Sequence, residues 1–294
     1  MAHISRRNFL EKTVVLGAAG LVAPSVMDLS AAGASPRVHR NTIGLAQWAL
    51  NGEIRERKWT NLDFPRIARE DFGISAIEFV NILWMDVPTM NYLNRLKQNA
   101  DNHGVTMTGI ACDAEGDACV PTAGEQRQFG INHRKWVDAA QYLGCYAIRI
   151  NCIGPRDREI PREEALKWSA ESLNHLVEYA IPANIIVLVE NHGGVSNDAD
   201  FMVDLMEEVN SRYLGILPDW RSPTPQFDNY EFLRKTLPYA PLSTHYRPQP
   251  TEELTAKMIR LCVDSGFSGY YCIETGPREE IPKGKALLEK YLKV

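Results

Sequence analysis

The chain has 294 residues, of which 45% are hydrophobic and 23% are charged, the composition of an ordinary globular protein. A net charge of −5 and a pI near 5.9 exclude the basic surface that nucleic-acid-binding proteins carry. No apolar run reaches the roughly 18 residues that a membrane-spanning helix needs, so we expect no such span.

The N-terminus has the three regions of an export signal. Ser5–Leu10 contains the pair Arg6-Arg7, Val14–Ala23 is apolar, and Ala32-Gly33-Ala34 is a small-residue cleavage site. Residues 1–35 therefore resemble a twin-arginine signal peptide, which implies export of the folded protein to the periplasm or cell envelope. The alternative is a short amphipathic helix.

Six cysteines follow the predicted signal, and their even number permits disulfides in an oxidising compartment. Cys112 and Cys119 flank one acidic loop and are the best candidate pair. Buried free thiols in a large core are the alternative, and the sequence does not choose between the two.

Eight short apolar stretches alternate with amphipathic helical segments after the signal. We predict strands at Thr42–Trp48, Ala76–Val80, Thr106–Cys112, Ala147–Asn151, Ile185–Glu190, Leu214–Leu217, Pro241–His245 and Tyr270–Glu274. Gly144 and Gly266 follow helical runs and are expected to end those helices. Eight such units, with no Gly-x-Gly-x-x-Gly after the first strand, favour an α/β (β/α)8 TIM barrel over a doubly wound sheet. No linker interrupts residues 40–294, which predicts a single domain.

Four titratable residues close consecutive predicted strands. Glu190 ends the fifth strand, Asp219 follows the sixth, and His245 and Glu274 end the seventh and eighth. In a TIM barrel these ends meet at one rim, where active sites are built. Each residue alone has an ordinary reading, such as a solvated loop carboxylate, a turn cap or a core histidine. Together they form an oxygen and nitrogen donor set that suits one divalent ion.

The run Val187–Gly194, Val-Leu-Val-Glu-Asn-His-Gly-Gly, resembles the fifth-strand motif of the xylose isomerase-like sugar isomerase/epimerase superfamily. The order and spacing of Asp219, His245 and Glu274 match the rest of the metal quartet of that group. The resemblance covers about residues 42–292.

This resemblance implies a metal-dependent proton transfer. The ion, with Mn²⁺ preferred and Mg²⁺, Co²⁺ or Zn²⁺ as alternatives, holds two neighbouring oxygens of a sugar and stabilises an enediolate. Glu190 and Glu274 are then ligands as well as the catalytic acid and base. Asp219 and His245 are ligands only.

Three positions depart from the ketose epimerases of the group. Ser222 replaces a histidine, Thr251 an arginine and Ser196 an acidic residue. No phosphate-cradling loop is evident, so we expect a non-phosphorylated sugar or cyclitol as substrate.

Other side chains near the strand ends are candidates for substrate binding. Alternation along a strand decides which of them face the site, and the sequence does not fix its register. The Trp48, Trp84 and Trp220 rings could also be core residues. The loop 51–61 is either a lid or plain surface. The substrate-binding candidates are Asn191, His192, Glu78, Arg149, Arg247 and Trp220.

The leading hypothesis is thus a divalent-metal-dependent isomerase or epimerase. One alternative is a lyase or dehydratase that acts on a keto-sugar or 3-keto-glycoside at the same metal site. Another is a non-catalytic sugar-binding barrel or a subunit of an oxidoreductase complex. The expected partner is a small sugar-like molecule, no nucleic-acid partner is expected, and a homo-oligomer is left open.

Overall fold

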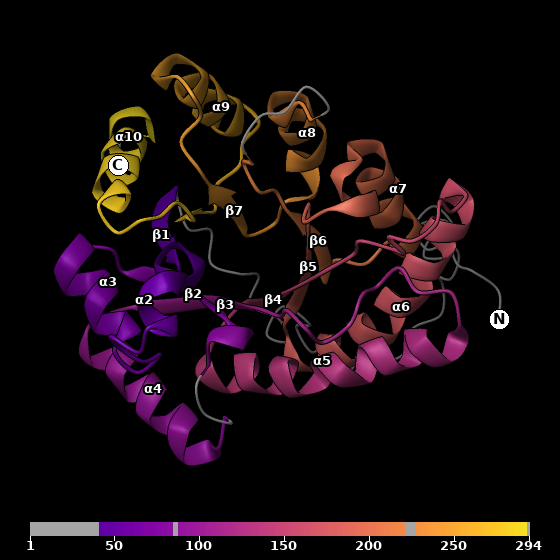
Figure 1. Cartoon of the computed structure of the whole chain (residues 1–294), viewed down its shortest axis with the longest axis horizontal. Coiled ribbons are helices and arrows are strands. Elements are labelled where there is room, and N and C mark those ends of the chain that lie inside the picture. Colours follow the sequence, from indigo (N-terminus) through magenta and orange to yellow (C-terminus); the bar gives the residue numbers. More distant parts are fainter. Residues whose placement is uncertain (1–40, 85–87, 222–226, 293–294) are drawn as a thin grey trace, which may run out of the picture. The chain divides into compact units, whose positions relative to one another are not determined.

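Eight parallel strands alternate with helices along the residues described by the computed structural model, 41–84, 88–221 and 227–292. In the sheet they follow the order β6-β5-β4-β3-β2-β1-β8-β7, so the (β/α)8 prediction is confirmed (Figure 1). The bounds also agree closely with the predicted strands. They are β1 (Thr42–Ala46), β2 (Ala76–Val80), β3 (Thr106–Ala111), β4 (Ala147–Ile150), β5 (Ile186–Glu190), β6 (Leu214–Leu217), β7 (Ser243–Tyr246) and β8 (Tyr270–Ile273).

The barrel closes between β6 and β7 through a single bridge, which pairs Asp219 with His245. The backbone N–H of His245 donates to the Pro218 carbonyl at 3.0 Å, and that of Trp220 donates to the His245 carbonyl at 3.0 Å. The closure of the barrel therefore places two of the predicted metal ligands side by side.

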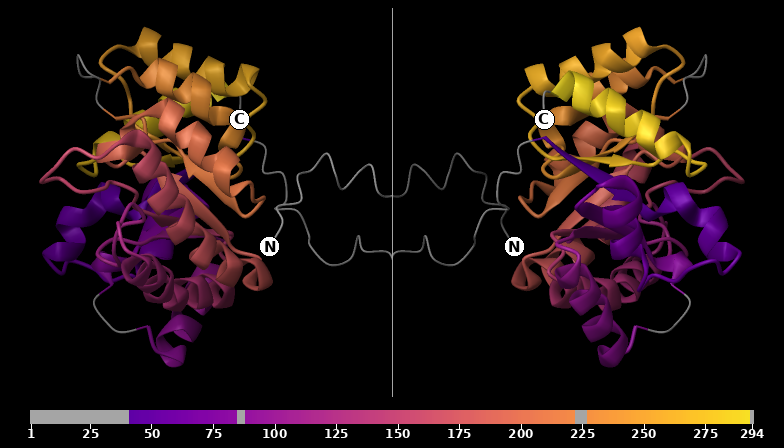
Figure 2. Two further views of the ribbon diagram at one scale, coloured as in Figure 1. Left: turned by 90° about the vertical axis from the view of Figure 1, so that its right-hand side faces the viewer. Right: turned by 90° about the vertical axis from the view of Figure 1, so that its left-hand side faces the viewer.

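The helices surround the strands (Figure 1). The last two, α9 and α10, orange and yellow, lie side by side in both side views (Figure 2). Gly144 ends α5 and Gly266 follows α9, both with positive φ, as predicted. The helices are α2 (Asn51–Arg55), α3 (Phe64–Phe72), α4 (Met90–Asn102), α5 (Ala123–Leu143), α6 (Arg162–Ala183), α7 (Ala199–Val209), α8 (Asn229–Thr236), α9 (Glu252–Asp264) and α10 (Glu280–Leu292), with 3-10 turns η2 (Gln47–Leu50), η3 (Asn81–Leu83), η4 (Gly194–Asn197) and η5 (Leu237–Tyr239).

Alternation along β5 separates the barrel interior from the layer beneath the helices. Ile186 and Leu188 pack in a small apolar cluster inside the barrel, whereas Val187 and Val189 pack in the large core between strands and helices. Because side chains on a strand alternate between its two faces, Glu190 shares the inward face with Ile186 and Leu188. The predicted ligand is thus the third inward residue of its strand.

The same alternation fixes the positions that the sequence left open. Glu274 lies two residues beyond the inward Cys272, and Glu78 lies two residues beyond the inward Ala76. Arg149 occupies the equivalent inward position on β4. Charged side chains from four strands therefore enter the same end of the barrel interior.

The predicted signal segment, residues 1–35, lies outside the described residues. Among the residues that are described, no helix combines the length and apolarity that crossing a bilayer requires. All six cysteines are buried and free, including Cys112 and Cys119.

Candidate metal centre

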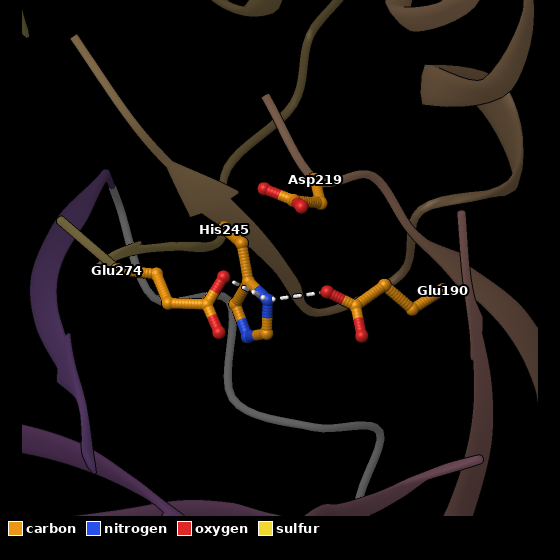
Figure 3. A group of neighbouring side chains, drawn as sticks. All are labelled: Glu190, Asp219, His245 and Glu274. Atoms are coloured by element: carbon orange, nitrogen blue, oxygen red, sulfur yellow. Dashed lines mark hydrogen bonds and ion pairs between the residues drawn. The ribbon is translucent and has the colours of Figure 1, made fainter. Parts of the chain in front are cut away.

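The four predicted ligands meet at the carboxyl ends of β5 to β8. One donor atom from each of Glu190, Asp219, His245 and Glu274 lies within 4.8 Å of the others. The Glu190 and Glu274 carboxylates flank the His245 ring (Figure 3). The exposed fractions are 2%, 4%, 1% and 6% in chain order, so three carboxylates and an imidazole share one buried space.

His245 is held by carboxylates on both ring nitrogens. Its Nε2 lies 2.8 Å from Oε2 of Glu78, and its Nδ1 lies 2.8 Å from Oε1 of Glu190 and 3.2 Å from Oε2 of Glu274. Burial alone would lower the pKa of His245, but Glu274, Glu78 and Glu190 together raise it well above its ordinary value. Carboxylate oxygens therefore lie within hydrogen-bond distance of both ring nitrogens.

Glu190 is clamped between two cations. Oε1 faces His245, and Oε2 lies 2.9 Å from Nε of Arg149. The second contact is an ion pair without hydrogen-bond alignment, since neither atom has a hydrogen-bond partner. Burial would raise the pKa of Glu190, yet Arg149 and His245 hold it far below its usual range. Glu190 is consequently a firmly ionised carboxylate.

Arg149 extends the site away from the quartet. It is 4% exposed, and its Nη1 donates to Oδ1 of Asp113 at 2.7 Å and to Oδ1 of Asn151 at 3.0 Å. Nδ1 of the exposed His192 lies 2.9 Å from the same Asn151 oxygen. This chain of contacts runs from buried Glu190 to the protein surface.

Asp219 is positioned by its neighbour on the previous strand. The Oδ1 of Asn191 accepts from the Asp219 backbone N–H at 2.7 Å, and its Nδ2 donates to the Asp219 carbonyl at 3.0 Å. Burial first, and then Glu274 and Glu190, raise the pKa of Asp219 to about 7. The Asn191 amide thus fixes the Asp219 backbone, and its expected substrate contact stays a prediction.

The second glycine of the motif permits the turn after Glu190. Gly194 has φ 55°, and a Cβ at this position would lie 1.8 Å from the carbonyl oxygen of Ile153. The same oxygen accepts from the backbone N–H of Val195 at 3.0 Å. Only glycine fits there, because the loops after β4 and β5 touch backbone to backbone.

A cavity of about 380 Å³ opens beside the quartet. Glu274 and Arg247 form its inner wall. Arg247 pairs with Asp219 through Nε at 2.9 Å and with Glu274 through Nη2 at 2.5 Å. Trp48 also lines the cavity, as do Asn51 and Glu53 of α2 and Arg278 of the loop after β8. The segment 51–61, predicted as a loop, thus begins with the short helix α2, and this helix borders the cavity.

The quartet fits a divalent ion. Metal bonds of about 2.1–2.4 Å keep the ligand atoms within about 4.8 Å of one another, which matches the observed cluster. Glu78 takes the Nε2 hydrogen of His245, so once Nδ1 loses its proton its lone pair points at the carboxylates. This carboxylate–histidine arrangement orients metal-binding imidazoles in other proteins. A divalent ion would also compensate the charge of the three buried carboxylates.

Of the six substrate-binding candidates, Arg247 is the one among the residues that line this cavity, and Trp220 and Glu78 have other roles. Trp220 is 1% exposed, donates from Nε1 to Oγ1 of Thr244 at 2.7 Å and packs with Tyr246 in the core under the helices. Its ring is therefore a core residue and not a sugar platform. Glu78 faces His245 inside the barrel, so it supports a ligand.

The departures from the epimerase pattern have structural roles where they are described. Ser196 accepts from the His192 backbone and donates to the Gly193 carbonyl, which stabilises the turn after β5. Thr251 is the N-cap of α9. Ser222 lies outside the described residues.

Sequence reasoning missed Asp113, the partner of Arg149. The rule that found the quartet also applies to Asp113, because it is an acidic residue that follows a strand, here two positions beyond the end of β3. It also missed Glu53 and Arg278, whose cavity position depends on the packing of two distant loops.

Fold and site together define a TIM barrel with a buried carboxylate–histidine cluster at the carboxyl ends of its strands. A family model for the xylose isomerase-like TIM barrel matches residues 67–222, more than half of the chain. The chain belongs to this family. No curated protein matches the sequence.

Several solved structures share this fold, and their names indicate different reactions. A D-tagatose 3-epimerase-like protein is 14% identical, with a TM-score of 0.68, over 86% of this chain and 97% of its own. The 3-keto-D-glucoside 4-epimerase of E. coli, in its apo form, is 14% identical, with a TM-score of 0.65, over 85% and 100%. The probable 3-DHS dehydratase of Bacillus anthracis is 13% identical, with a TM-score of 0.61, over 86% and 98%. At these identities the likeness concerns the fold.

Proposed function

We propose that the protein is a divalent-metal-dependent isomerase or epimerase of a non-phosphorylated sugar or cyclitol. The observation that carries this proposal is the buried quartet Glu190, Asp219, His245 and Glu274, whose donor atoms lie within 4.8 Å of one another beside a cavity. Three desolvated carboxylates on three of four consecutive strand ends destabilise a fold unless cations compensate them. Family membership supports the same chemistry.

The residues of the quartet have different roles in the proposed reaction. When bound, the ion supplies Lewis-acid stabilisation of the negative charge that develops on the substrate oxygens. Asp219 and His245 hold the ion, and Glu78 fixes the ring of His245 through its 2.8 Å contact. Glu190 and Glu274 are the two carboxylates that can exchange a proton with the substrate.

These two glutamates are not equivalent. Glu274 forms part of the cavity wall, whereas Glu190 is not among the described residues that line it. Glu190 is further stabilised as an anion by Arg149 and His245, so its lowered pKa makes it the weaker base. We assign the first proton abstraction to Glu274, which lines the cavity. Glu190 is the other proton-transfer candidate, and it would have to take up a proton before it could return one on the opposite side of the carbon.

The difference in position between Glu274 and Glu190 also favours a second candidate, a lyase or dehydratase acting on a keto-sugar or 3-keto-glycoside. Such an elimination needs one carboxylate base and no proton return to the same carbon, so a single cavity-facing Glu274 is sufficient. Family structures named as a 3-keto-D-glucoside 4-epimerase and as a probable 3-DHS dehydratase support keeping both candidates.

Deuterium exchange tests the proposal. The Mn²⁺-loaded protein is incubated in D₂O with a panel of non-phosphorylated keto-sugars and keto-cyclitols, and the products are followed by NMR. Deuterium beside the carbonyl with all substituents retained supports the isomerase or epimerase, and loss of water or of an aglycone supports the lyase. Metal bound without exchange in any member of the panel would contradict both and leave a sugar-binding barrel or a complex subunit.

We also propose export by the twin-arginine route, which rests on Arg6-Arg7 and the segments that follow them. Replacing both arginines by lysine is expected to keep the protein in the cytoplasm, as measured by cell fractionation. Equal periplasmic amounts of the two forms would overturn this assignment.

A further inference from the structure

Arg247 lies between the quartet and the cavity, because it contacts two quartet residues and lines the cavity. Its Nε lies 2.9 Å from Oδ1 of Asp219 and its Nη2 lies 2.5 Å from Oε2 of Glu274. The guanidinium therefore bridges two of the four predicted metal ligands. Its side chain is 32% exposed, against 4% and 7% for the two acids.

One oxygen connects this bridge to the centre of the quartet. Oε2 of Glu274, which accepts from Arg247, is also the oxygen 3.2 Å from Nδ1 of His245. A divalent ion bound by both His245 and Glu274 through these atoms would use the oxygen that already accepts from Arg247. The guanidinium and the ion therefore compete for one carboxylate.

The neighbouring arginines are not available to replace Arg247 as the counterion. Arg149 is engaged by Glu190 and Asp113. Arg221 lies 3.9 Å from Oδ2 of Asp219, and its Nη1 donates to Asn197 at 2.8 Å. In the metal-free cluster, Arg247 is thus the cation that makes close contact with both Asp219 and Glu274.

The cavity offers Arg247 a place to move. Arg247 already lines this space of about 380 Å³. The second arginine on its wall, Arg278, is fixed by Glu53 at 2.7 Å and Asp71 at 2.7 Å. Of the two arginines that line the cavity, a displaced Arg247 would therefore be the one that is free to move.

We propose that Arg247 is the internal counterion of the metal-free site, and that a divalent cation displaces its guanidinium from Asp219 and Glu274 into the cavity. This inference rests on the metal site of the proposed function. It adds that the cavity gains a free guanidinium when the ion binds.

Calorimetry with the metal alone tests this exchange. The full chain is stripped of metal, and Mn²⁺ is titrated into the wild type, Arg247→Met, Arg247→Lys and the matched control Arg221→Met. Arg247→Met is expected to tighten Mn²⁺ binding on the order of tenfold, because the competitor is gone. The same variant should lower the Tm of the metal-free protein, whereas Arg221→Met should change neither quantity.

The outcomes separate this inference from the proposed function. If the wild type binds no Mn²⁺, both fall. If the wild type binds Mn²⁺ and Arg247→Met binds it equally or more weakly, this inference alone is overturned, because the guanidinium then positions the ligands or does nothing. Should Arg247→Met fail to fold, Arg247→Lys decides in the same way, since a point charge cannot bridge two carboxylates as the guanidinium fork does.

Discussion

The two ends of the barrel interior are built from the same strands but from opposite kinds of residue. Toward the strand starts, the interior is a small apolar cluster that includes Ala76, Ile186 and Tyr270. Toward the strand ends, it holds carboxylates, Arg149 and a histidine that are equally buried. One period-two pattern positions both sets, so the barrel uses its apolar end for stability and its charged end for chemistry.

The largest expected effect concerns the charged end. Glu274→Gln removes the carboxylate on the cavity wall while keeping its shape, so turnover should fall by roughly 10²–10⁴-fold. The melting temperature should stay near that of the wild type. Glu190→Gln should also abolish turnover, although its buried partner Arg149 then loses a counterion and the fold is weakened further. Full activity of either variant in the exchange assay would remove the assigned role.

Arg149→Met breaks the buried pairs that stabilise Glu190 and Asp113. It leaves both carboxylates without their closest cation, which should lower the free energy of unfolding by about 3–5 kcal/mol in the presence of a chelator. Added Mn²⁺ should recover part of this loss. Urea unfolding measures it, with the more exposed Arg221→Met as the control, and a change equal to that of the control would contradict the assignment.

Leu188→Ala sharpens the comparison from the apolar end. Leu188 is 2% exposed inside the barrel, one inward position before Glu190. Its truncation should cost about 3 kcal/mol of stability through lost burial and a cavity. Turnover per folded molecule should stay within a few-fold of the wild type, which corresponds to a change in activation free energy on the order of 1 kcal/mol. A loss of activity as large as that of Glu274→Gln would show that the two ends are not separate.

The smallest effect is a pH dependence of metal affinity. Asp219, with a pKa raised to about 7, must lose its proton to bind a cation, so its ionisation alone should make Mn²⁺ affinity fall about tenfold per unit as the pH drops below 7, in addition to the proton that His245 releases. Without a bound ion, the raised pKa of Asp219 makes the protein less stable as the pH rises, whereas metal affinity increases with pH. The contribution of Asp219 is present below its ordinary value of 3.8 and is lost as the pH rises through about 7.

Mn²⁺ titrations between pH 6 and 8 measure this slope. Asp219→Asn, which cannot ionise at this position, is the control and should show a shallower dependence. A wild-type affinity that is constant across this range would contradict the protonation argument.

The fold could be predicted almost completely from the sequence because buried parallel strands are short apolar runs with polar ends. Six of the eight predicted strands begin at the residue found in the structure, and the other two begin within two residues of it. The quartet could be predicted for the same reason, since each ligand closes a strand or follows it. The sequence left open which strand residues face inward, and the structure shows that the charged residue follows an inward apolar one by two positions, as on β5.

The side-chain partners could not be predicted. Trp220 and Arg247 both stand near strand ends, yet the first packs in the helix-facing core and the second bridges Asp219 and Glu274. What distinguishes them is which neighbours fill the space, and this depends on segments distant in the sequence. The hydrogen bonds between the Asn191 amide and the Asp219 backbone likewise depend on a neighbouring segment and were not predicted.

The central claim is that the charged end of the barrel is a metal centre. Its most direct test is the metal content of the protein purified without chelator and after Mn²⁺ addition, measured for the wild type and for Asp219→Ala/His245→Ala. The account predicts about one divalent ion per chain in the wild type and its loss in the double variant, because both ligands at the barrel closure are gone. A wild type that holds no ion even with added Mn²⁺ would contradict it and leave the quartet as a structural ion-pair cluster.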